Sequence, residues 1–473
     1  MAVISSPTYD PTTTATNLAN AYVAPTKAIL DKQTTQATAV GTGLTTLSAA
    51  LSAFQGTLQG LASSTSSVSA TKATFSNTSV ATATAKPTAA AGTYSFYVQQ
   101  LATAGQMAYN VPTVTSAGGS MSIALNTGAP IGVDLTTADS NNDGFLSAKE
   151  LAAAINASPD NKSRITASTI TVNNVQQLVL TSTQTGKDNA VAAITTAGGA
   201  DPGLTSDLGA GNTLTDASNA IVWAGGKNGT KVEQASNTFS IVDDVSFTVT
   251  QAQGVNDAAV SLTVGPDSSG TASNVQKFVD AYNTLLAALN KLTAPGDHTV
   301  VESTDANGTP TATAEDAAFY NDAGVTNLRD RLGSILRSVT GGQSLISFGI
   351  TATKDGSLTL DSSRLNKAIA ANPSGLDTLF GRAGIGVDSG ALGAMNKLVT
   401  SWTTSAGGFI SQRTTQNDKL QSDLADRQAT VKDQFTNAYK RFLAQFSALQ
   451  QLQSSMTSTS NMFTAMFSSD SSS

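Results

Sequence analysis

The sequence predicts a multidomain α+β protein: the two ends of the chain form helices that pair as a coiled-coil-like leg, and β-rich antiparallel head domains are inserted between them. Two observations predict this fold. Apolar residues recur every three or four positions near both ends of the 473-residue chain, which is the heptad pattern of paired helices. Between about Phe75 and Pro266 apolar residues instead recur at every second position, and Gly, Asn and Asp separate these segments as turn residues. This pattern indicates antiparallel strands.

The composition excludes several classes of function. The chain has 26 basic and 33 acidic residues and only 12% charged residues, so it offers no basic surface for nucleic acid. It has no cysteine and one histidine, which excludes thiol chemistry, disulfide scaffolds and Cys/His zinc sites. That residue, His298, lies in a turn-like stretch and is interpreted as a solvated loop residue. We therefore expect no enzyme.

The N-terminal region contains the first predicted leg helix. Residues 1–39 are expected to be a flexible segment with some helix, and residues 40–72 to form the leg helix. No basic residue precedes Lys27, and neither a signal-peptide core nor a membrane-length apolar run is present, so we expect export without a cleaved signal peptide and no membrane insertion. The heptad seam of this helix has spacings of 4, 3, 4, 3, 4 and 3 and consists of Val40, Leu44, Leu47, Leu51, Phe54, Leu58 and Leu61.

The centre of the chain is expected to hold two head domains. An inner β-rich domain takes residues 73–112 and 230–272, and an outer domain with a helix-and-hairpin motif takes residues 113–229. A helix is predicted from Lys149. Strands are predicted at residues 93–98, 164–172, 176–183, 245–252 and 259–264.

The remainder of the chain returns to the helical period. Residues 273–394 are expected to be the helical part of the leg or body, with a loop or linker at 294–314. A long coiled-coil helix follows at 395–467, and a disordered tail at 468–473. The seam of this long helix is interrupted only by Gln428, Gln445 and Thr459, and it consists of Leu424, Val431, Phe435, Ala438, Phe442, Leu449, Leu452, Met456, Phe463 and Met466.

Each seam could simply bury one face of a helix inside its own domain. The two helices stand at opposite ends of the chain, however, and each continues into a Ser/Thr-rich tail that is too poor in large apolar residues to fold alone. This arrangement favours assembly with other subunits. We therefore expect the two seams to contact other subunits as well as each other.

One loop has the pattern of a calcium site. Residues 139–150 fit the spacing D-x-[DN]-x-[DN]-G-x5-E, which supplies oxygen ligands around Ca²⁺. The alternative is an Asx-rich turn in which the last serine and glutamate form a capping box for the next helix. The expected ligands are Asp139, Asn141, Asp143, Phe145 through its carbonyl, Ser147 and Glu150.

Several stretches resemble the bacterial flagellar filament-capping family, also called hook-associated protein type 2. They lie at residues 91–102, 274–286, 348–381 and 439–467, and they follow one another in the same order as in the family. Residues 149–191 look like the small helix-and-hairpin motif that flagellins and caps share in their outer domains. Two features depart from the family pattern: an SGLD-like run near the start is missing, and the loop at Asp139 looks like an addition.

The resemblance implies a ring-shaped homo-oligomer at the distal tip of the bacterial flagellum. Its helical legs would insert into the tip, and the ring would promote folding and polymerisation of exported flagellin and prevent its loss. The implied partners are other copies of the chain, flagellin, the filament tip or hook–filament junction, and the flagellar export apparatus with its chaperone. The implied location is outside the cell. No cofactor is required. The Ca²⁺ that the loop spacing predicts would bind in the outer head domain.

Two other functions are considered. The head domain could act as an adhesin that binds surface or host glycans, or the chain could be another structural subunit of the flagellum. Residues 348–381 and 439–467 favour the cap over the second alternative because they resemble caps and not flagellins. An enzyme is disfavoured because no nucleophile, base and oxyanion site occur together.

Overall fold

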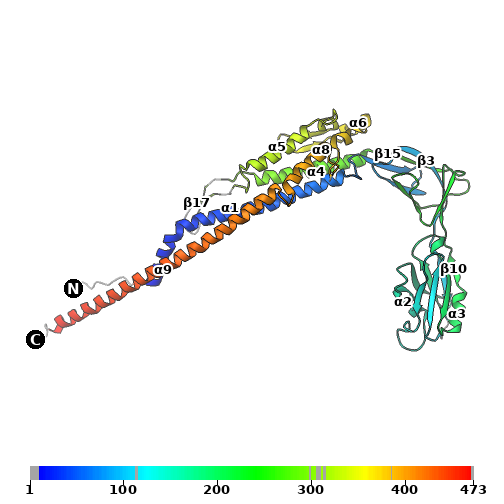
Figure 1. Cartoon of the computed structure of the whole chain (residues 1–473), viewed down its shortest axis with the longest axis horizontal. Helices are drawn as coiled ribbons and strands as arrows, with labels where there is room; N and C mark the ends of the chain where they lie inside the picture. Colours follow the sequence, from blue (N-terminus) through cyan, green and yellow to red (C-terminus); the bar gives the residue numbers. More distant parts are fainter. Residues whose placement is uncertain are drawn as a thin grey trace. The chain divides into compact units, whose positions relative to one another are not determined.

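The computed structural model describes residues 10–469 except 112–114, 298–299, 305–309, 313–315 and 385. His298 and the last four residues of the predicted tail lie outside the described residues. The chain divides into two compact units. Both ends of the chain form the leg unit, which takes residues 1–64 and 272–473, and residues 65–271 form the head unit. This confirms the predicted α+β fold, in which a β-rich head is inserted between terminal helices (Figure 1).

The first helix of the leg unit, α1, is continuous from Pro11 to Leu61. It begins at Asp10, whose carboxylate accepts hydrogen bonds from the N–H groups of Thr12 and Thr13. The predicted boundary at residue 40 and the predicted end at residue 72 are therefore wrong. The sequence pattern missed this start because alanines make up much of the buried face there, which consists of Ala15, Ala19, Val23, Leu30 and Ala37.

The C-terminal helix α9 runs from Phe409 to Ser469 and lies against α1. Gln421 Nε2 donates to the Ala37 carbonyl at 3.3 Å, and Gln428 Nε2 donates to Thr34 Oγ1 at 2.9 Å. Because residue numbers fall along α1 as they rise along α9, the two helices are antiparallel. Figure 1 shows α1 and α9 side by side in this unit.

The long helix does not begin at residue 395, as the sequence predicted. Residues Gly390–Thr403 form a separate helix, α8, and a short non-helical segment separates it from α9. This segment contains Gly407, whose φ of 85° lies in the left-handed region that favours glycine. Residues 468 and 469, assigned to the tail, are still helical.

The rest of the leg unit is helical with two small hairpins. One of these hairpins lies within residues 294–314, which the sequence predicted to be a loop. Its β-branched residues, which begin at Val300, favour strand structure. The hairpins are β16 (Val300–Thr304) with β17 (Pro310–Ala312) and β18 (Ile350–Ala352) with β19 (Leu358–Leu360). The helices are α4 (Ser268–Leu292), α5 (Ala323–Arg337), α6 (Ser362–Ala371) and α7 (Gly375–Phe380), with a 3-10 turn at Leu345–Phe348.

The head unit contains an inner core between two antiparallel sheets. Phe96 and Phe247 meet at its centre with ring centroids 4.9 Å apart. The five-stranded sheet has the order β1-β15-β3-β11-β12 and the three-stranded sheet the order β13-β14-β2. Their strands are β1 (Ala70–Phe75), β2 (Ala81–Ala85), β3 (Gly92–Gln100), β11 (Ala220–Ala224), β12 (Thr230–Gln234), β13 (Thr238–Phe239), β14 (Val245–Val249) and β15 (Val260–Asp267).

The outer core of the head unit lies among two further antiparallel sheets and two helices, α2 (Ala148–Ala157) and α3 (Pro202–Gly209), with a 3-10 turn at Lys187–Asn189. The sheets have the orders β10-β4-β8-β7 and β6-β5-β9. Their strands are β4 (Gln106–Asn110), β5 (Ser120–Leu125), β6 (Ile131–Asp134), β7 (Ile165–Val172), β8 (Val175–Ser182), β9 (Val191–Ala197) and β10 (Asn212–Thr215).

The two cores divide the chain differently from the predicted boundaries at residues 112 and 230. Strand β4, expected in the inner domain, packs in the outer core through Tyr109, and β11, expected in the outer domain, packs in the inner core through Val222. The sequence predicted no strand at either segment, and the alternation of apolar and polar residues carries no information about which sheet a strand joins.

Candidate functional site

The predicted seam of α1 lies inside the leg unit. Leu44, Leu47, Leu51, Phe54, Leu58 and Leu61 are buried, and Val40 is half-buried. The Phe54 ring meets the ring of Tyr282 from α4 edge-on, with centroids 6.4 Å apart. The six buried residues therefore pack α1 against its own unit, which is the alternative that the sequence left open.

The first half of the α9 seam is buried in the same way. Leu424, Val431 and Ala438 are buried, and Phe435 packs against the cluster that Leu424 and Val431 form with α1. The α1 side of this cluster consists of Val23, Leu30 and Ala37. Farther along α9, the Arg441 guanidinium lies 6.0 Å from the ring of Tyr22 on α1, so the two helices also meet there.

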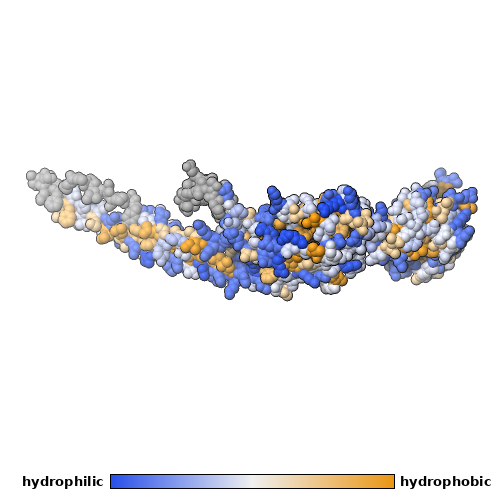
Figure 2. Space-filling view, turned by 90° about the horizontal axis from the view of Figure 1, so that it is seen from above, coloured by the Kyte–Doolittle hydropathy of each residue, from blue (hydrophilic) through white to orange (hydrophobic). Residues whose placement is uncertain are grey.

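The second half of the α9 seam is exposed in the structure. Phe442 is half-buried, but Leu449 is 41%, Leu452 57%, Met456 65% and Phe463 56% exposed. We call Leu449, Leu452, Met456 and Phe463 the exposed seam. Figure 2 shows apolar patches recurring along the slender part of the leg unit. A row of large apolar side chains at heptad spacing is typical of a helix that docks against a partner helix.

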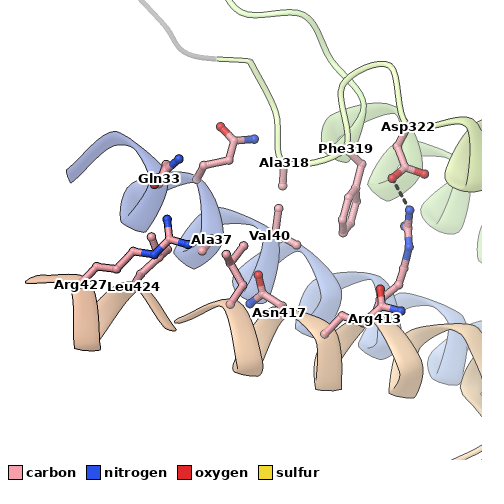
Figure 3. Close-up of a pocket in the computed structure, with 13 residues that line it drawn as sticks. Gln33, Ala37, Val40, Ala318, Phe319, Asp322, Arg413, Asn417, Leu424 and Arg427 are labelled. Carbon is pink, nitrogen blue, oxygen red and sulfur yellow. Dashed lines mark hydrogen bonds and ion pairs between the residues drawn. The ribbon is translucent and has the colours of Figure 1, made fainter. Parts of the chain in front are cut away.

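A groove of about 440 Å³ lies between α1, α9 and the turn before α5 (Figure 3). Arg413 from α9 forms an ion pair with Asp322, and its guanidinium lies 5.7 Å from the ring of Phe319. Burial raises the pKa of Asp322, but the hydrogen bonds from the Val325 N–H and from Arg413 lower the pKa by more. Asp322 is also the N-cap of α5, so this pair fixes α5 to α9.

Sequence reasoning missed both this ion pair and the start of the α1 seam. Val23, Leu30 and Ala37 stand seven residues apart, and Leu44, Leu51 and Leu58 continue the same step. The heptad pattern was therefore present in the sequence from Val23, but the small side chain of Ala37 made it hard to recognise. No local signal in the sequence could have paired Asp322 with Arg413, because they lie 91 residues apart.

The predicted calcium loop adopts the capping alternative in the structure. Ser147 Oγ accepts the N–H of Glu150, and Glu150 Oε2 accepts the N–H and hydroxyl of Ser147, which is a capping box at the start of α2. Glu150 Oε1 accepts the N–H and hydroxyl of Ser140. The loop enters from a strand, β6, and not from a helix.

The other expected ligands bond within the loop. Asp139 accepts the N–H groups of Asp143 and Gly144, and Asn141 accepts the N–H of Asp143 at 2.9 Å. Asp143 accepts the N–H of Phe145 at 2.8 Å, so the Phe145 carbonyl is the one expected ligand group with no part in these bonds. Among the described residues no three acidic or histidine side chains gather into a metal site. Calcium binding here stays a prediction.

The capping box sets the ionisation of Glu150. Hydrogen bonds from the Ser147 N–H and then the Ser147 hydroxyl lower the pKa of Glu150 from 4.5 to about 2, against the effect of burial. The charged carboxylate therefore stabilises the fold above the unfolded-state pKa near 4.5, and this contribution is lost as the pH falls toward 2.

The calcium prediction is tested by thermal melting of the whole chain in millimolar Ca²⁺ and in chelator. If the loop binds with a Kd of about 10⁻⁴ to 10⁻³ M, as extracellular modules do, Ca²⁺ at ten times Kd stabilises the head by about 1.4 kcal/mol. Asp139→Ala should remove this effect, and Asp160→Ala, outside the loop, should keep it. Equal melting midpoints of the wild-type head in Ca²⁺ and in chelator would leave only the capping role.

Comparisons with known proteins cover most of the chain. Residues 217–458 match the model "Flagellar hook-associated protein 2 C-terminus", and residues 8–105 match the model "Flagellar hook-associated protein 2 N-terminus". The chain is 30% identical to the lateral flagellar hook-associated protein 2 of Vibrio parahaemolyticus, over 81% of this chain and 83% of that protein. It is 31% identical to the B-type flagellar hook-associated protein 2 of Pseudomonas aeruginosa, over 91% of this chain and 89% of that protein.

A solved structure has the same fold. The flagellar cap protein FliD, domains D1–D2–D3, from Escherichia coli aligns with a TM-score of 0.56 and 26% identity. The alignment covers 81% of this chain and 99% of that one.

Proposed function

The chain belongs to the flagellar hook-associated protein 2 family, which caps the flagellar filament, and we propose that it holds the filament tip through the exposed seam of α9. The protein is a structural component of the flagellum and acts at its tip, where it associates with other copies and contacts flagellin. The comparisons give no support to the adhesin alternative, and the family is the cap rather than another subunit of the flagellum.

One observation carries the proposal for the exposed seam. The α9 seam keeps one heptad register despite its polar interruptions, but its apolar side chains change from buried at Leu424, Val431 and Ala438 to exposed from Leu449 onward. Burying a large apolar side chain contributes about 1.5 to 3 kcal/mol, so four such residues supply a strong docking face. We assign this face to flagellin at the filament tip, where helix-to-helix packing would bury it.

The cap is proposed to work as a ring that promotes flagellin polymerisation. Identical subunits in a ring use two different surfaces, which close by rotation. While the exposed seams hold the tip, flagellin that arrives through the channel would fold beneath the ring before it can diffuse away. No covalent step is needed, because the ring acts by confinement and by reversible contacts.

Export through the flagellar apparatus, assisted by its chaperone and without cleavage, is part of the same proposal. By length and composition alone α1 is apolar enough to cross a membrane, contrary to the expectation from the sequence. Core helices of water-soluble folds pass the same test, and α1 contributes its apolar face to the leg unit from Ala15 to Leu61. Cleavage within this region would remove part of the leg, which supports retention of the N-terminus.

The function is tested in a flagellated strain that lacks its own copy of this protein. We expect such cells to release unpolymerised flagellin and to bear short or no filaments, and the intact chain should restore filament growth. Mass analysis of the chain from shed filaments should show the uncleaved N-terminus. Filaments of normal length without the protein would contradict the capping function, and a shortened N-terminus would contradict only the export proposal.

A further inference from the structure

Strand β7 is an edge strand of the outer head sheet, and only the first half of its edge is covered. Asn156 Nδ2 donates to the Ala167 carbonyl at 2.7 Å, and the Ala167 N–H donates back to Asn156 Oδ1 at 2.9 Å. Asn161 makes the same reciprocal pair with Ile165, both bonds at 3.0 Å. These two side-chain amides therefore imitate a neighbouring strand and close the edge there.

The second half of the edge is open. Because backbone groups alternate along a strand, Thr169 and Thr171 direct their N–H and C=O groups outward, as Ile165 and Ala167 do. Among the described residues nothing pairs with the outward groups of Thr169 and Thr171. Ile170 is 37% and Val172 43% exposed, and β7 has no charge and no proline. Such an edge is a template for another strand.

The opposite edge of the same sheet has matching properties. Strand β10 pairs on one side only, with β4, and its register shifts between Thr213 and Thr215. All four of its residues are exposed, including Leu214 at 44%, and none is charged. Strand β10 has four residues, the same number as the open part of β7, Thr169–Val172.

The strand directions fit head-to-tail pairing between copies. Each neighbouring pair in the order β10-β4-β8-β7 is antiparallel, so β10 runs antiparallel to β7. When an identical sheet is placed beside β7 in the same orientation, its β10 meets β7 antiparallel. The two edges are different surfaces on opposite sides of one sheet, which is what a closing ring requires.

We propose that the open edge of β7 pairs with β10 of the next copy, so that the outer head sheet continues from one copy to the next. This inference rests on the proposed ring, and it names the contact that would join the heads. The pairing would satisfy the free backbone groups of Thr169 and Thr171 and cover Ile170 and Leu214. The experiment below distinguishes this pairing from two alternatives, which are a twofold pairing of β7 with β7 and the binding of a strand of flagellin to β7.

Cysteine cross-linking tests the pairing, because the chain has no cysteine of its own. The full-length double variant Ile170→Cys/Leu214→Cys is treated with a short bis-maleimide, both purified and on shed filaments. We expect a ladder of multimers from the double variant and none from either single variant. Both positions are exposed, so the substitutions leave the fold intact, which the melting midpoint checks.

Each other result has a defined meaning. Dimers from Ile170→Cys alone would overturn the proposal in favour of twofold pairing, and adducts with flagellin would overturn it in favour of strand capture. Absence of multimers on filaments of normal length would overturn the edge contact and leave the capping function standing. Failure of the intact chain to restore filament growth in the strain that lacks it would instead count against the proposed function.

A charge on the open edge gives an independent measurement. Ile170→Lys places a lysine beside the outward groups of Thr169 and Thr171, a change that blocks strand addition in natural sheets. We expect assembly, followed by light scattering, to need about tenfold more protein. Thr166→Lys lies on the same strand and the same face, beside the part that Asn156 and Asn161 cover, and should assemble like wild type. Equal assembly of the two variants would overturn the proposal.

Discussion

Replacement of both Leu452 and Phe463 by aspartate should abolish filament growth while the chain remains folded. Both side chains are more than half exposed, so the charges cost the isolated chain little. In a docked helix the same charges would lie in an apolar interface, at a cost on the order of 2 kcal/mol or more for each. Cells with this variant should therefore release flagellin into the medium, as measured by comparing flagellin in the supernatant and in filaments.

A matched control separates the exposed seam from the helix that carries it. Ser454 and Asn461 lie two residues from Leu452 and Phe463, which places them about 200° around the helix. The variant Ser454→Asp/Asn461→Asp adds the same charges to the same two turns on the other face. It should support normal filaments, and equal loss of growth in both variants would mean that charge on α9, and not the seam, is what matters.

Truncation of Leu424 should destabilise the leg unit more than truncation of its neighbour Leu420. Leu424 is 1% exposed between α9 and α1, whereas Leu420, one turn earlier, is 48% exposed. Leu424→Ala leaves a cavity and should lower the free energy of unfolding by about 2 to 5 kcal/mol. Leu420→Ala should change it by no more than about 0.5 kcal/mol.

The chain offers a specific probe for this comparison. It has two tryptophans: Trp402 is buried in the leg unit with its ring centroid 5.3 Å from that of Phe409, and Trp223 lies in the head unit. In a Trp223→Phe background, denaturant unfolding followed by fluorescence reports the leg unit alone. Equal midpoints for the two leucine variants would show that the antiparallel packing of α1 on α9 does not hold the leg together.

The sequence predicted those parts of the fold that large apolar residues mark at a regular period. Leu44 to Leu61 and Leu424 to Phe463 identified the two leg helices, and an approximate period of two with β-branched residues identified β7 and β8. The start of α1 was missed because alanines at Ala15, Ala19 and Ala37 carry its packing, and small residues weaken the pattern. Sheet membership of β4 and β11 depends on contacts distant in the sequence, which alternation does not encode.

The candidate site was predicted only as part of one long seam. A heptad pattern cannot show where one partner ends, and only the folded chain separates the buried residues up to Ala438 from the exposed ones from Leu449 onward. The spacing of the loop at residues 139–150 was compatible with either a calcium site or a helix-capping box. The hydrogen bonds of Glu150 with Ser147 and Ser140 match the capping box. Neither the Asp322–Arg413 pair nor the open edge of β7 leaves a local signal in the sequence.

The proposed contact between the exposed seam and flagellin is tested most directly by photo-cross-linking on growing filaments. A photoreactive amino acid is placed at Phe463 in one strain and at Asn461, on the opposite face of α9, in another. Irradiation should yield an adduct with flagellin from position 463 and little or none from position 461. If position 463 yields no flagellin adduct on filaments of normal length, or only adducts between copies of the cap, then the exposed seam does not hold the filament tip.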